Sequence, residues 1–360
     1  MTSRPHNTIL KKLCVYLQSE IEGMNHRNMS TYQRFLLHLS VVTIGVALLY
    51  VPVVWVVGRL HIPSNVRFIP ANYGHMGLRL AEADSMLAYG GPSMLFIGSS
   101  HCYRSFDTRV YDSAGYSSFN LGSSNQSPKQ SLALLQRYGG GWPLSVAVIE
   151  VHPDIMGVDG DESAVDIISN TRVDKPVFAM AMRQRSLRVF GTMVCSVVDR
   201  WLRGDHSCDE DYVFHNTVNV DGADQPVDLT YIPGGYVETS PLRFTPSPLP
   251  PASINVRQDQ LEALDRCVQF LVDHGVRCLL VEVPSSKARY NSYLNHDDFA
   301  RKMSDLAGDR ACYLNLNDDE DLASMLDDST CFFDDDHLNS KGAAILNRSF
   351  LQKLTTSSQL

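Results

Sequence analysis

Residues 94–107 read MLFIGSSHCYRSFD, an apolar run that stops at a glycine and continues with two serines and a histidine. The run 94–97 has the composition of a buried β-strand. A strand that ends at glycine and then presents small hydroxyl side chains is one way in which an α/β protein displays a serine nucleophile at the edge of its sheet. Many ordinary turns have the same composition, so the rest of the chain has to decide between the two interpretations.

Further strands and helices alternate along the chain, which predicts an α/β fold with a parallel sheet. The apolar runs are short, rich in β-branched residues and bounded by glycine, proline or polar residues. The intervening helices have amphipathic spacing, and one of them ends at Gly275 immediately before the next strand. The predicted strands are 94–98, 118–121, 145–151, 276–283 and 313–316, and the predicted helices are 127–138, 256–275 and one after Asn339.

The alternation is interrupted between about 158 and 255. Residues 177–202 have helical spacing, whereas residues 228–251 are rich in turn formers and prolines. We interpret this stretch as an insertion that covers one face of the sheet and shapes the substrate site.

The composition bounds the class of protein. A chain of 360 residues, 44% of them hydrophobic, can bury a full core, and we expect one decorated domain. A net charge of −9 without clustered Lys and Arg argues against a nucleic-acid partner. The 8 cysteines show no C-x-x-C spacing and no histidine spacing suited to zinc, so they predict no metal centre. Oxidation of a pair such as Cys267 with Cys278 stays open.

Residues 35–58 form an apolar run long enough to cross a bilayer as a helix. We expect an uncleaved anchor rather than a cleaved signal peptide, because the apolar core is long and no small-x-small site follows it. Basic residues before the run place residues 1–34 in the cytoplasm, and a stem at 60–90 then leads to a domain outside the cytoplasmic membrane. The basic residues are Arg4, Lys11, Lys12, Arg27 and Arg34.

The C-terminal stretch 332–346, FFDDDHLNSKGAAIL, contains an acid and a histidine three residues apart. At that spacing Asp334 can reach and orient the imidazole of His337, and a histidine held in this way is a general base. The alternative is a solvated acidic turn. Together with Ser100 after the first strand, however, the pair supplies the three members of a catalytic triad.

With these two stretches the chain resembles the SGNH (GDSL-like) hydrolase superfamily. That family's first block is a strand leading into Gly-Asp-Ser, matched here by Gly98-Ser99-Ser100. Its last block is Asp-x-x-His continued by Asn-x-x-Gly, matched by residues 334–342. The resemblance implies a three-layer α/β/α flavodoxin-like fold with a parallel sheet over residues 91–355. It implies Ser100 as nucleophile, His337 as base and Asp334 as its orienting acid.

The family's two middle blocks match less closely. The second block resembles residues 119–125, FNLGSSN, and implies a backbone oxyanion donor at Gly122 or Asn125. The third block of the family, Gly-x-Asn-Asp, is replaced by residues 150–154, EVHPD, with proline where the oxyanion asparagine is expected. Glu150 or His152 could replace that donor or contact substrate, and a structural histidine is the alternative for His152.

An N-terminal anchor and a divergent third block also occur in membrane-bound branches of the superfamily, such as the alginate O-acetyltransferase-like and teichoic-acid D-alanine-transfer proteins. The resemblance therefore implies an envelope-facing serine acyl esterase or O-acyltransferase that acts on carbohydrate or envelope polymer, without metal or cofactor. A polytopic membrane acyltransferase is an implied partner. Two alternatives stay open: a catalytically degenerate glycan-binding or scaffold protein that partners such an acyltransferase, and an envelope scaffold whose two motifs are ordinary turns.

Overall fold

The computed structural model describes residues 30–59, 73–203 and 215–356. Most of the predicted cytoplasmic segment and the first part of the predicted stem lie outside these residues. The chain divides into two compact units, one ending at Val56 and one beginning at Val57. Each unit is described by itself.

The first unit is built around one long helix, α2 (Thr31–Arg59), which contains Pro52. Its most apolar part has a mean hydropathy of 2.3 and is only 11% buried. The hydroxyl groups of Ser40 and Thr43 are satisfied within the helix, since they donate to the carbonyls four residues earlier. The helix is therefore long and apolar enough to cross a membrane, and a signal sequence has the same properties.

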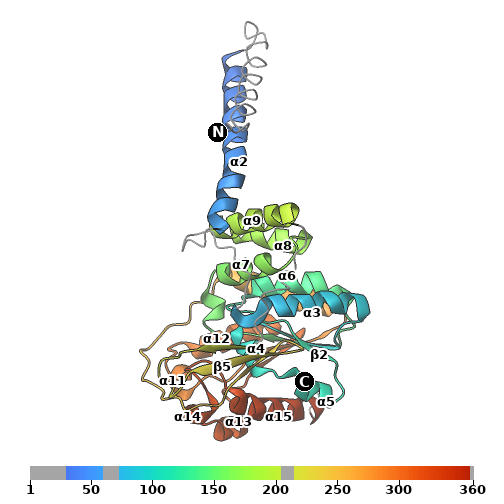
Figure 1. Cartoon of the computed structure of the whole chain (residues 1–360). Helices are drawn as coiled ribbons and strands as arrows, with labels where there is room; N and C mark the ends of the chain where they lie inside the picture. Colours follow the sequence, from blue (N-terminus) through green and yellow to red (C-terminus); the bar gives the residue numbers. More distant parts are fainter. Residues whose placement is uncertain (1–29, 60–72, 204–214, 357–360) are drawn as a thin grey trace, which may run out of the picture. The chain divides into compact units, whose positions relative to one another are not determined.

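A parallel sheet of five strands forms the centre of the second unit, as the sequence predicts (Figure 1). The strand order is β2-β1-β3-β7-β8, which becomes 2-1-3-4-5 when only this sheet is numbered. The order reverses between β1 and β3, and in open α/β sheets ligands bind at the carboxyl ends of the strands beside such a reversal. The strands are β1 (Met94–Ile97), β2 (Ser118–Asn120), β3 (Val146–Glu150), β7 (Arg277–Glu282) and β8 (Ala311–Asn315).

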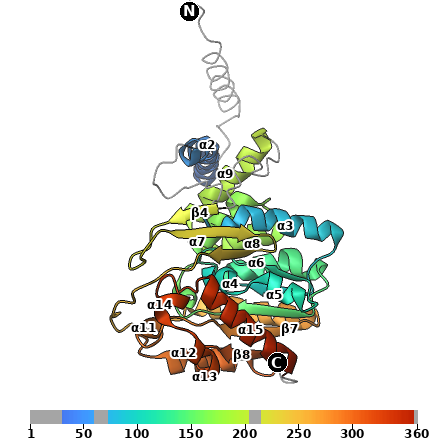
Figure 2. The ribbon, with the colours of Figure 1, turned by 60° about the horizontal axis from the view of Figure 1, so that its bottom comes forward.

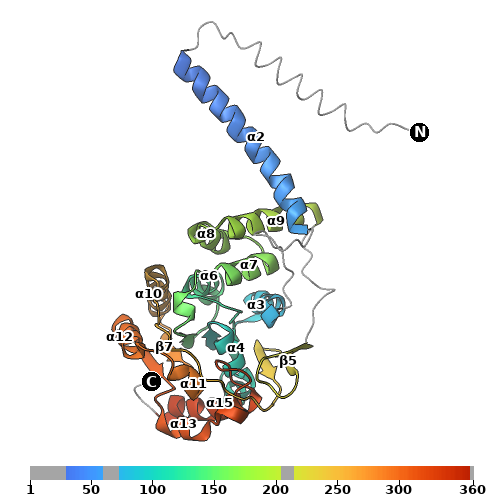
Figure 3. The same ribbon diagram turned by 90° about the vertical axis from the view of Figure 1, so that its left-hand side faces the viewer.

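Each face of the sheet packs into its own hydrophobic core, because alternate strand residues point to opposite faces. Leu95 and Ile97 of β1 belong to one core, and Met94 and Phe96 belong to the other. Figure 3 shows α6 and α7 on one side of the sheet and α13 and α15 on the other.

The helices of the second unit divide between these two cores. Those contributing to the first are α3 (Met76–Tyr89), α6 (Pro128–Tyr138), α7 (Asp161–Asn170), α8 (Lys175–Gln184), α9 (Leu187–Arg203), α10 (Gln258–Asp273) and α12 (His296–Ala307). Those contributing to the second are α4 (Ser100–Ser105), α5 (Thr108–Ser113), α13 (Glu320–Met325), α14 (Asp328–Cys331) and α15 (Ser340–Thr356). The short helix α11 (Lys287–Tyr290) follows β7.

The stretch from about 158 to 255 interrupts the alternation, and it contains α7, α8, α9 and a second sheet. The single helical run predicted at 177–202 is divided into α8 and α9, because Arg185 adopts a left-handed conformation with φ 53°. The turn-rich stretch 228–251 contributes to an antiparallel sheet of three strands (Figure 2). These strands are β4 (His215–Val218), β5 (Val227–Ile232) and β6 (Tyr236–Thr239).

Residues 76–89, which the sequence analysis places in a stem, form α3 and pack into the domain. Met76 and Ala83 are fully buried, and Leu80 is 1% exposed. These side chains lie in the same core as one face of β1. Helix α3 is therefore part of the folded unit and not of a stem.

Candidate active site

The first part of the candidate site is the turn between β1 and α4. The Ser99 hydroxyl caps α4 by accepting the His101 N–H at 3.2 Å, so Ser100 is the first helical residue. Backbone N–H groups in the first turn of a helix, such as that of Ser100, have no hydrogen-bond partner within the helix. Only glycine fits at position 98, since a Cβ there would lie 2.6 Å from the Cβ of Glu150. The Glu150 carboxylate, at the end of β3, accepts the Ser99 N–H at 2.6 Å and supports the turn from the neighbouring strand.

The second part of the site is the loop that precedes α15. The Oδ1 of Asp334 accepts the backbone N–H groups of Asp336 and His337 at 2.9 and 2.7 Å, which closes a tight turn. The Asn339 side chain then caps α15, because its Oδ1 accepts the N–H of Gly342 at 3.2 Å. Asp334 and Asn339 therefore determine the shape of this loop through their side-chain hydrogen bonds to the backbone.

These two parts bring Ser100, His337 and Asp334 together. The Ser100 Oγ lies 2.8 Å from Nε2 of His337, within the hydrogen-bond range that a serine–histidine pair requires. The other ring nitrogen, Nδ1, lies 3.0 and 2.9 Å from the two carboxylate oxygens of Asp334. An Nδ1–H that donates to Asp334 leaves Nε2 free to accept the serine proton, which is the arrangement of a general base.

The electrostatic environment keeps Asp334 ionised. Burial by itself would raise the pKa of this carboxyl group. The charge interaction and hydrogen bond with His337, and the positive charge of Arg104, outweigh burial and lower the pKa to about 2. Asp334 is therefore a carboxylate at neutral pH.

The His337 ring lies within a stack of flat side chains. Phe333 stacks on it with ring centroids 5.4 Å apart, and His101 stacks on it at 4.3 Å with an interplanar angle of 8°. His152 continues the stack, 3.8 Å from His101 and inclined by only 6°. The Arg104 guanidinium covers the Phe333 ring at 4.6 Å. The stack restricts rotation of the His337 ring and so holds its two nitrogens toward their partners.

The two further histidines of the stack are neutral. Burial lowers the pKa of His101 well below its usual value and that of His152 to about 3, and neighbouring imidazoles add to both effects. The Nδ1 of His101 lies 2.8 Å from the Ser99 hydroxyl. The Nδ1 of His152 accepts the Asp154 N–H at 3.3 Å, so its proton is on Nε2, 3.4 Å from the Ser285 hydroxyl.

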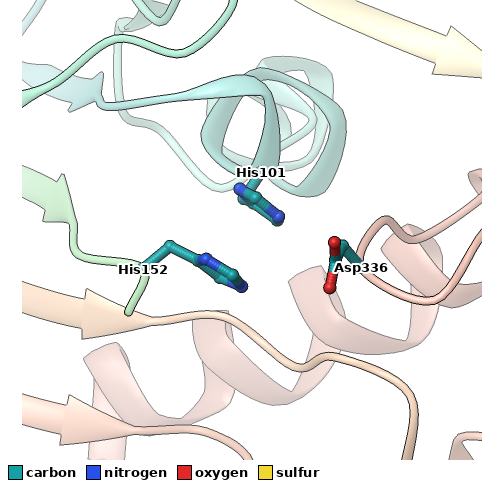
Figure 4. A group of neighbouring side chains, drawn as sticks. All are labelled: His101, His152 and Asp336. Atoms are coloured by element: carbon teal, nitrogen blue, oxygen red, sulfur yellow. The ribbon is translucent and has the colours of Figure 1, made fainter. Parts of the chain in front are cut away.

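His101, His152 and Asp336 place possible ligand atoms within 4.8 Å of one another (Figure 4). An imidazole binds a metal ion through a lone pair in the plane of its ring. The two rings are stacked and nearly parallel, so no point lies in both planes. Asp336 is also paired with Arg289, whose Nε is 2.9 Å from its Oδ1. These side chains, as arranged here, do not direct their lone pairs to one common point.

The predicted backbone oxyanion donors occupy different surroundings. Gly122 lies against the turn between β1 and α4, since a Cβ there would be 3.1 Å from the carbonyl oxygens of both Gly98 and Ser99. Its N–H, however, already donates to the side-chain oxygen of Asn120 at 3.1 Å. Asn125 adopts a left-handed conformation with φ 49°, and its side chain donates to Glu162 at 2.7 Å. The Asn125 side chain is therefore directed to Glu162.

The whole cluster lies where the sheet order reverses. Ser100 follows β1, and Glu150 and His152 end or follow β3, so both strands deliver side chains at their carboxyl ends. The Ser100 residue is 9% exposed, and the His337 side chain is 16% exposed. Ser100 and His337 are thus set just below the surface, whereas Glu150 is 5% exposed and holds the Ser99 N–H.

Several residues of the cluster are not predicted by the sequence analysis. Phe333 stacks on His337, and Arg289 and Ser285 approach Asp336 and His152. The available signal is positional. Ser285 and Arg289 follow β7, whose carboxyl end adjoins that of β3 in a parallel sheet. The stack itself has no sequence signature, because it joins residues from three separate segments.

Glu150 gives the site a pH-dependent effect on stability. Burial raises the pKa of Glu150 to about 7, against its hydrogen bond from Ser99. The folded protein holds this proton more tightly than the unfolded chain does. The free energy of unfolding therefore falls as the pH rises from the pKa of Glu150 in the unfolded chain toward 7, and it is constant at higher pH. Glu150→Gln removes the titration and can still accept the Ser99 N–H. We expect it to raise the free energy of unfolding by about 3 kcal/mol at pH 8 and by less than about 1 kcal/mol at pH 5.

The measurement is chemical or thermal unfolding of the detergent-solubilised chain at both pH values. Glu262→Gln, at an exposed position of α10, is the matched control and should change little at either pH. Equal effects of Glu150→Gln at pH 5 and pH 8 would show that the carboxyl group does not titrate as the structure implies.

No family model and no curated protein sequence matches this chain. Its structure defines an α/β protein with a parallel sheet of five strands and an N-terminal apolar helix. Any statement about its activity therefore rests on the geometry of the cluster around Ser100 and on the motifs that build it.

Proposed function

We propose that this protein is an envelope-facing serine acyl esterase or O-acyltransferase of SGNH type, with a flavodoxin-like fold, that acts on carbohydrate or envelope polymer. The observation that carries the proposal is the continuous hydrogen-bonded series from Ser100 Oγ through His337 to Asp334, at 2.8 Å and then 2.9 Å. The position of this series at the reversal of the sheet order supports the proposal, because substrates reach such an edge.

The first half of the reaction forms an acyl–serine ester. The Ser100 Oγ attacks the acyl carbonyl carbon while its proton passes to Nε2 of His337. Asp334 stabilises the imidazolium that forms. Collapse of the tetrahedral intermediate breaks the bond to the leaving alkoxide, which takes the proton from His337. The acyl group is then held on Ser100, and His337 is again neutral.

The second half differs only in the acceptor. His337 removes a proton from water or from a sugar hydroxyl, whose oxygen attacks the acyl–serine carbonyl. The ester bond to Ser100 breaks, and Ser100 recovers its proton from His337. Water gives hydrolysis, and a sugar hydroxyl gives transfer, so one site is compatible with both reactions.

We propose that the oxyanion is held by the Ser100 N–H and by a backbone N–H of Gly122 or Asn125. Pro153 provides no side-chain amide, and the Gly122 N–H is already engaged with Asn120. A missing oxyanion donor costs about 10²–10³ in rate. We therefore expect slow turnover of generic esters and faster reaction with a dedicated substrate, whose remote contacts position the acyl group.

The location in the proposal follows from α2. If α2 is an uncleaved anchor with the basic N-terminal segment in the cytoplasm, the second unit faces the periplasm or cell exterior. Envelope polymers and a polytopic membrane acyltransferase that supplies acyl groups are then accessible partners. The mechanism requires no nucleic acid, metal or cofactor.

We expect His101 to act as a positioning residue for His337. Replacing His101 by alanine removes one wall of the stack and should lower kcat about 10–100-fold with little change in KM, because misplacement of a reacting group by about 1 Å has an effect of this size. His101→Phe keeps a flat ring at the same place and should restore most of the rate with an unchanged pH profile. If phenylalanine is as poor as alanine, His101 acts through its nitrogen atoms and not through stacking.

The proposed reaction is tested with the full chain in detergent and p-nitrophenyl acetate as acyl donor. We expect slow release of p-nitrophenol and, when an envelope-type oligosaccharide is added, acetylated sugar in excess of free acetate. Rapid hydrolysis that no acceptor diverts would leave a plain esterase. The absence of any Ser100-dependent acyl transfer or hydrolysis would favour the degenerate binding protein, for which the engaged Gly122 amide is the specific observation.

A further inference from the structure

Helix α9 carries an apolar stripe on the face that is turned away from the domain core. Leu187, Val194, Val197 and Trp201 recur at spacings of seven, three and four residues, which places them on one side of an α-helix. Leu187 is 81% exposed, Trp201 is 83% exposed and Val197 is 48% exposed. Large apolar side chains that share one face at this exposure require a partner of their own.

The other side of α9 already has its partner. Val189 is fully buried and Met193 is 5% exposed, and both belong to the hydrophobic core. The Ser196 hydroxyl donates to the carbonyl of Ile168 in α7 at 3.0 Å. In Figure 3, α8 and α9 form the layer outside α7. The stripe is therefore an additional apolar face and not part of the fold's own packing.

Helix α8, which packs against α9, also carries exposed apolar side chains. Phe178 and Met182 of α8 are 50% and 48% exposed. In the described residues outside α2, six of the eleven exposed large apolar side chains lie in these two helices. The six are Phe178, Met182, Leu187, Val197, Trp201 and Leu202. We refer to these six residues and Val194 as the α8–α9 face.

The segment that contains α8 and α9 carries a net positive charge, whereas the whole chain is negatively charged. Residues 175–203 contain six basic residues and one acidic residue, Asp199, in a protein whose net charge is −9. The basic residues are Lys175, Arg183, Arg185, Arg188, Arg200 and Arg203. Apolar side chains with a tryptophan, flanked by arginines, are the composition of a helix that lies in the interface of a bilayer containing anionic lipids.

We propose that the α8–α9 face rests on the surface of an anionic lipid bilayer, the one that α2 crosses. The proposal rests on the membrane location in the proposed function. Only thirteen residues, 60–72, separate the end of α2 from Tyr73, where the described part of the chain resumes, and such a segment can span at most roughly 50 Å. The second unit therefore stays near the bilayer. Contact through α8 and α9 would fix which way Ser100 faces relative to the membrane.

The experiment measures quenching of Trp201 by brominated lipids, with the full chain reconstituted in vesicles. The chain has 3 tryptophans. Trp55→Phe removes the tryptophan of α2, and Trp142 is only 6% exposed and serves as the internal reference. The difference between Trp55→Phe and Trp55→Phe/Trp201→Phe isolates the Trp201 emission. Vesicles contain phosphatidylethanolamine with phosphatidylglycerol, or phosphatidylcholine alone.

We expect brominated acyl chains to remove about half or more of the Trp201 emission in the anionic vesicles, because interfacial helices bury their apolar face about 5–10 Å into the membrane. Leu187→Glu/Val197→Glu should reduce this quenching. Leu294→Glu, which places the same charge at a 70% exposed apolar position elsewhere, should not. Quenching should also be weaker in phosphatidylcholine.

Unquenched Trp201 in a chain that resists alkaline carbonate extraction would overturn the proposal while leaving the anchor intact. Release of the chain by carbonate would instead remove the membrane location itself. Unquenched Trp201 in vesicles with blue-shifted emission in native membranes would overturn the proposal in favour of a protein partner. Equal quenching in both lipid mixtures would contradict the role of the arginines.

Discussion

Ser100→Ala should abolish turnover of p-nitrophenyl acetate by the full chain, with a loss of at least about 10³-fold in kcat. The reason is that alanine removes the hydroxyl that lies 2.8 Å from His337 Nε2 and that attacks the acyl carbonyl in the proposed mechanism. His337→Ala should cause a loss of the same order. Because the two residues act as one unit, the double variant should be little worse than either single one.

The control for this prediction is Ser113→Ala, which removes an exposed serine hydroxyl of α5 that bonds only to the Val110 carbonyl at 2.7 Å. It should retain full activity. Thermal unfolding should show that Ser100→Ala remains folded, since Ser99 and not Ser100 caps α4. Activity that survives Ser100→Ala would refute the mechanism, and activity lost equally in Ser113→Ala would reveal a general folding defect.

Asp334→Asn should lower kcat about 10²–10⁴-fold while leaving KM nearly unchanged. The asparagine amide can donate to Nδ1 of His337, which stabilises the tautomer whose proton sits on Nε2, facing Ser100. That tautomer cannot accept the serine proton. The loss of negative charge also removes stabilisation of the imidazolium.

Asp335→Asn is the matched control, because it makes the same chemical change at the next residue. The Asp335 side chain approaches Ser286 at 3.5 Å and does not contact His337. We expect an activity within about twofold of the unmodified protein, as for most substitutions that leave the reacting groups in place. Equal losses in the two variants would point to general disturbance of the loop rather than to orientation of the histidine.

The part of the site that local sequence predicts is the part built by short segments. The Gly98–Ser100 turn and the Asp334–His337 pair each depend on contacts within a few residues of the chain. Their residue types and spacing therefore indicate the local structure directly. The distance between Ser100 and His337 then follows from the parallel sheet, whose strand β1 and C-terminal helix the sequence also predicts. In the structure this separation is 2.8 Å.

The parts that the sequence does not predict depend on contacts between distant segments. The imidazole stack requires His101, His152 and His337 from three places in the chain, and no spacing rule relates them. The engagement of the Gly122 amide by Asn120 is a side-chain contact without a sequence signature. The antiparallel sheet in the insertion was hidden because its short strands lie among prolines and glycines, which are typical of loops.

Helix α3 is a further element whose packing depends on distant segments and is not predicted by the sequence. A stretch directly after an apolar run is naturally interpreted as a stem, yet Met76, Leu80 and Ala83 pack into the main core. Their spacing of three and four residues is helical, but the sequence gives no indication of which surface they meet.

The most direct test of the central claim is mass spectrometry of the acyl–enzyme. The full chain is mixed with p-nitrophenyl acetate, quenched in acid and digested, and the peptide containing residues 94–107 is examined. The account predicts an added acetyl group on Ser100 that is absent in Ser100→Ala and strongly reduced in His337→Ala. Acetyl located on Cys102 or another residue, or acyl turnover with no modified Ser100 at any quench time, would contradict it.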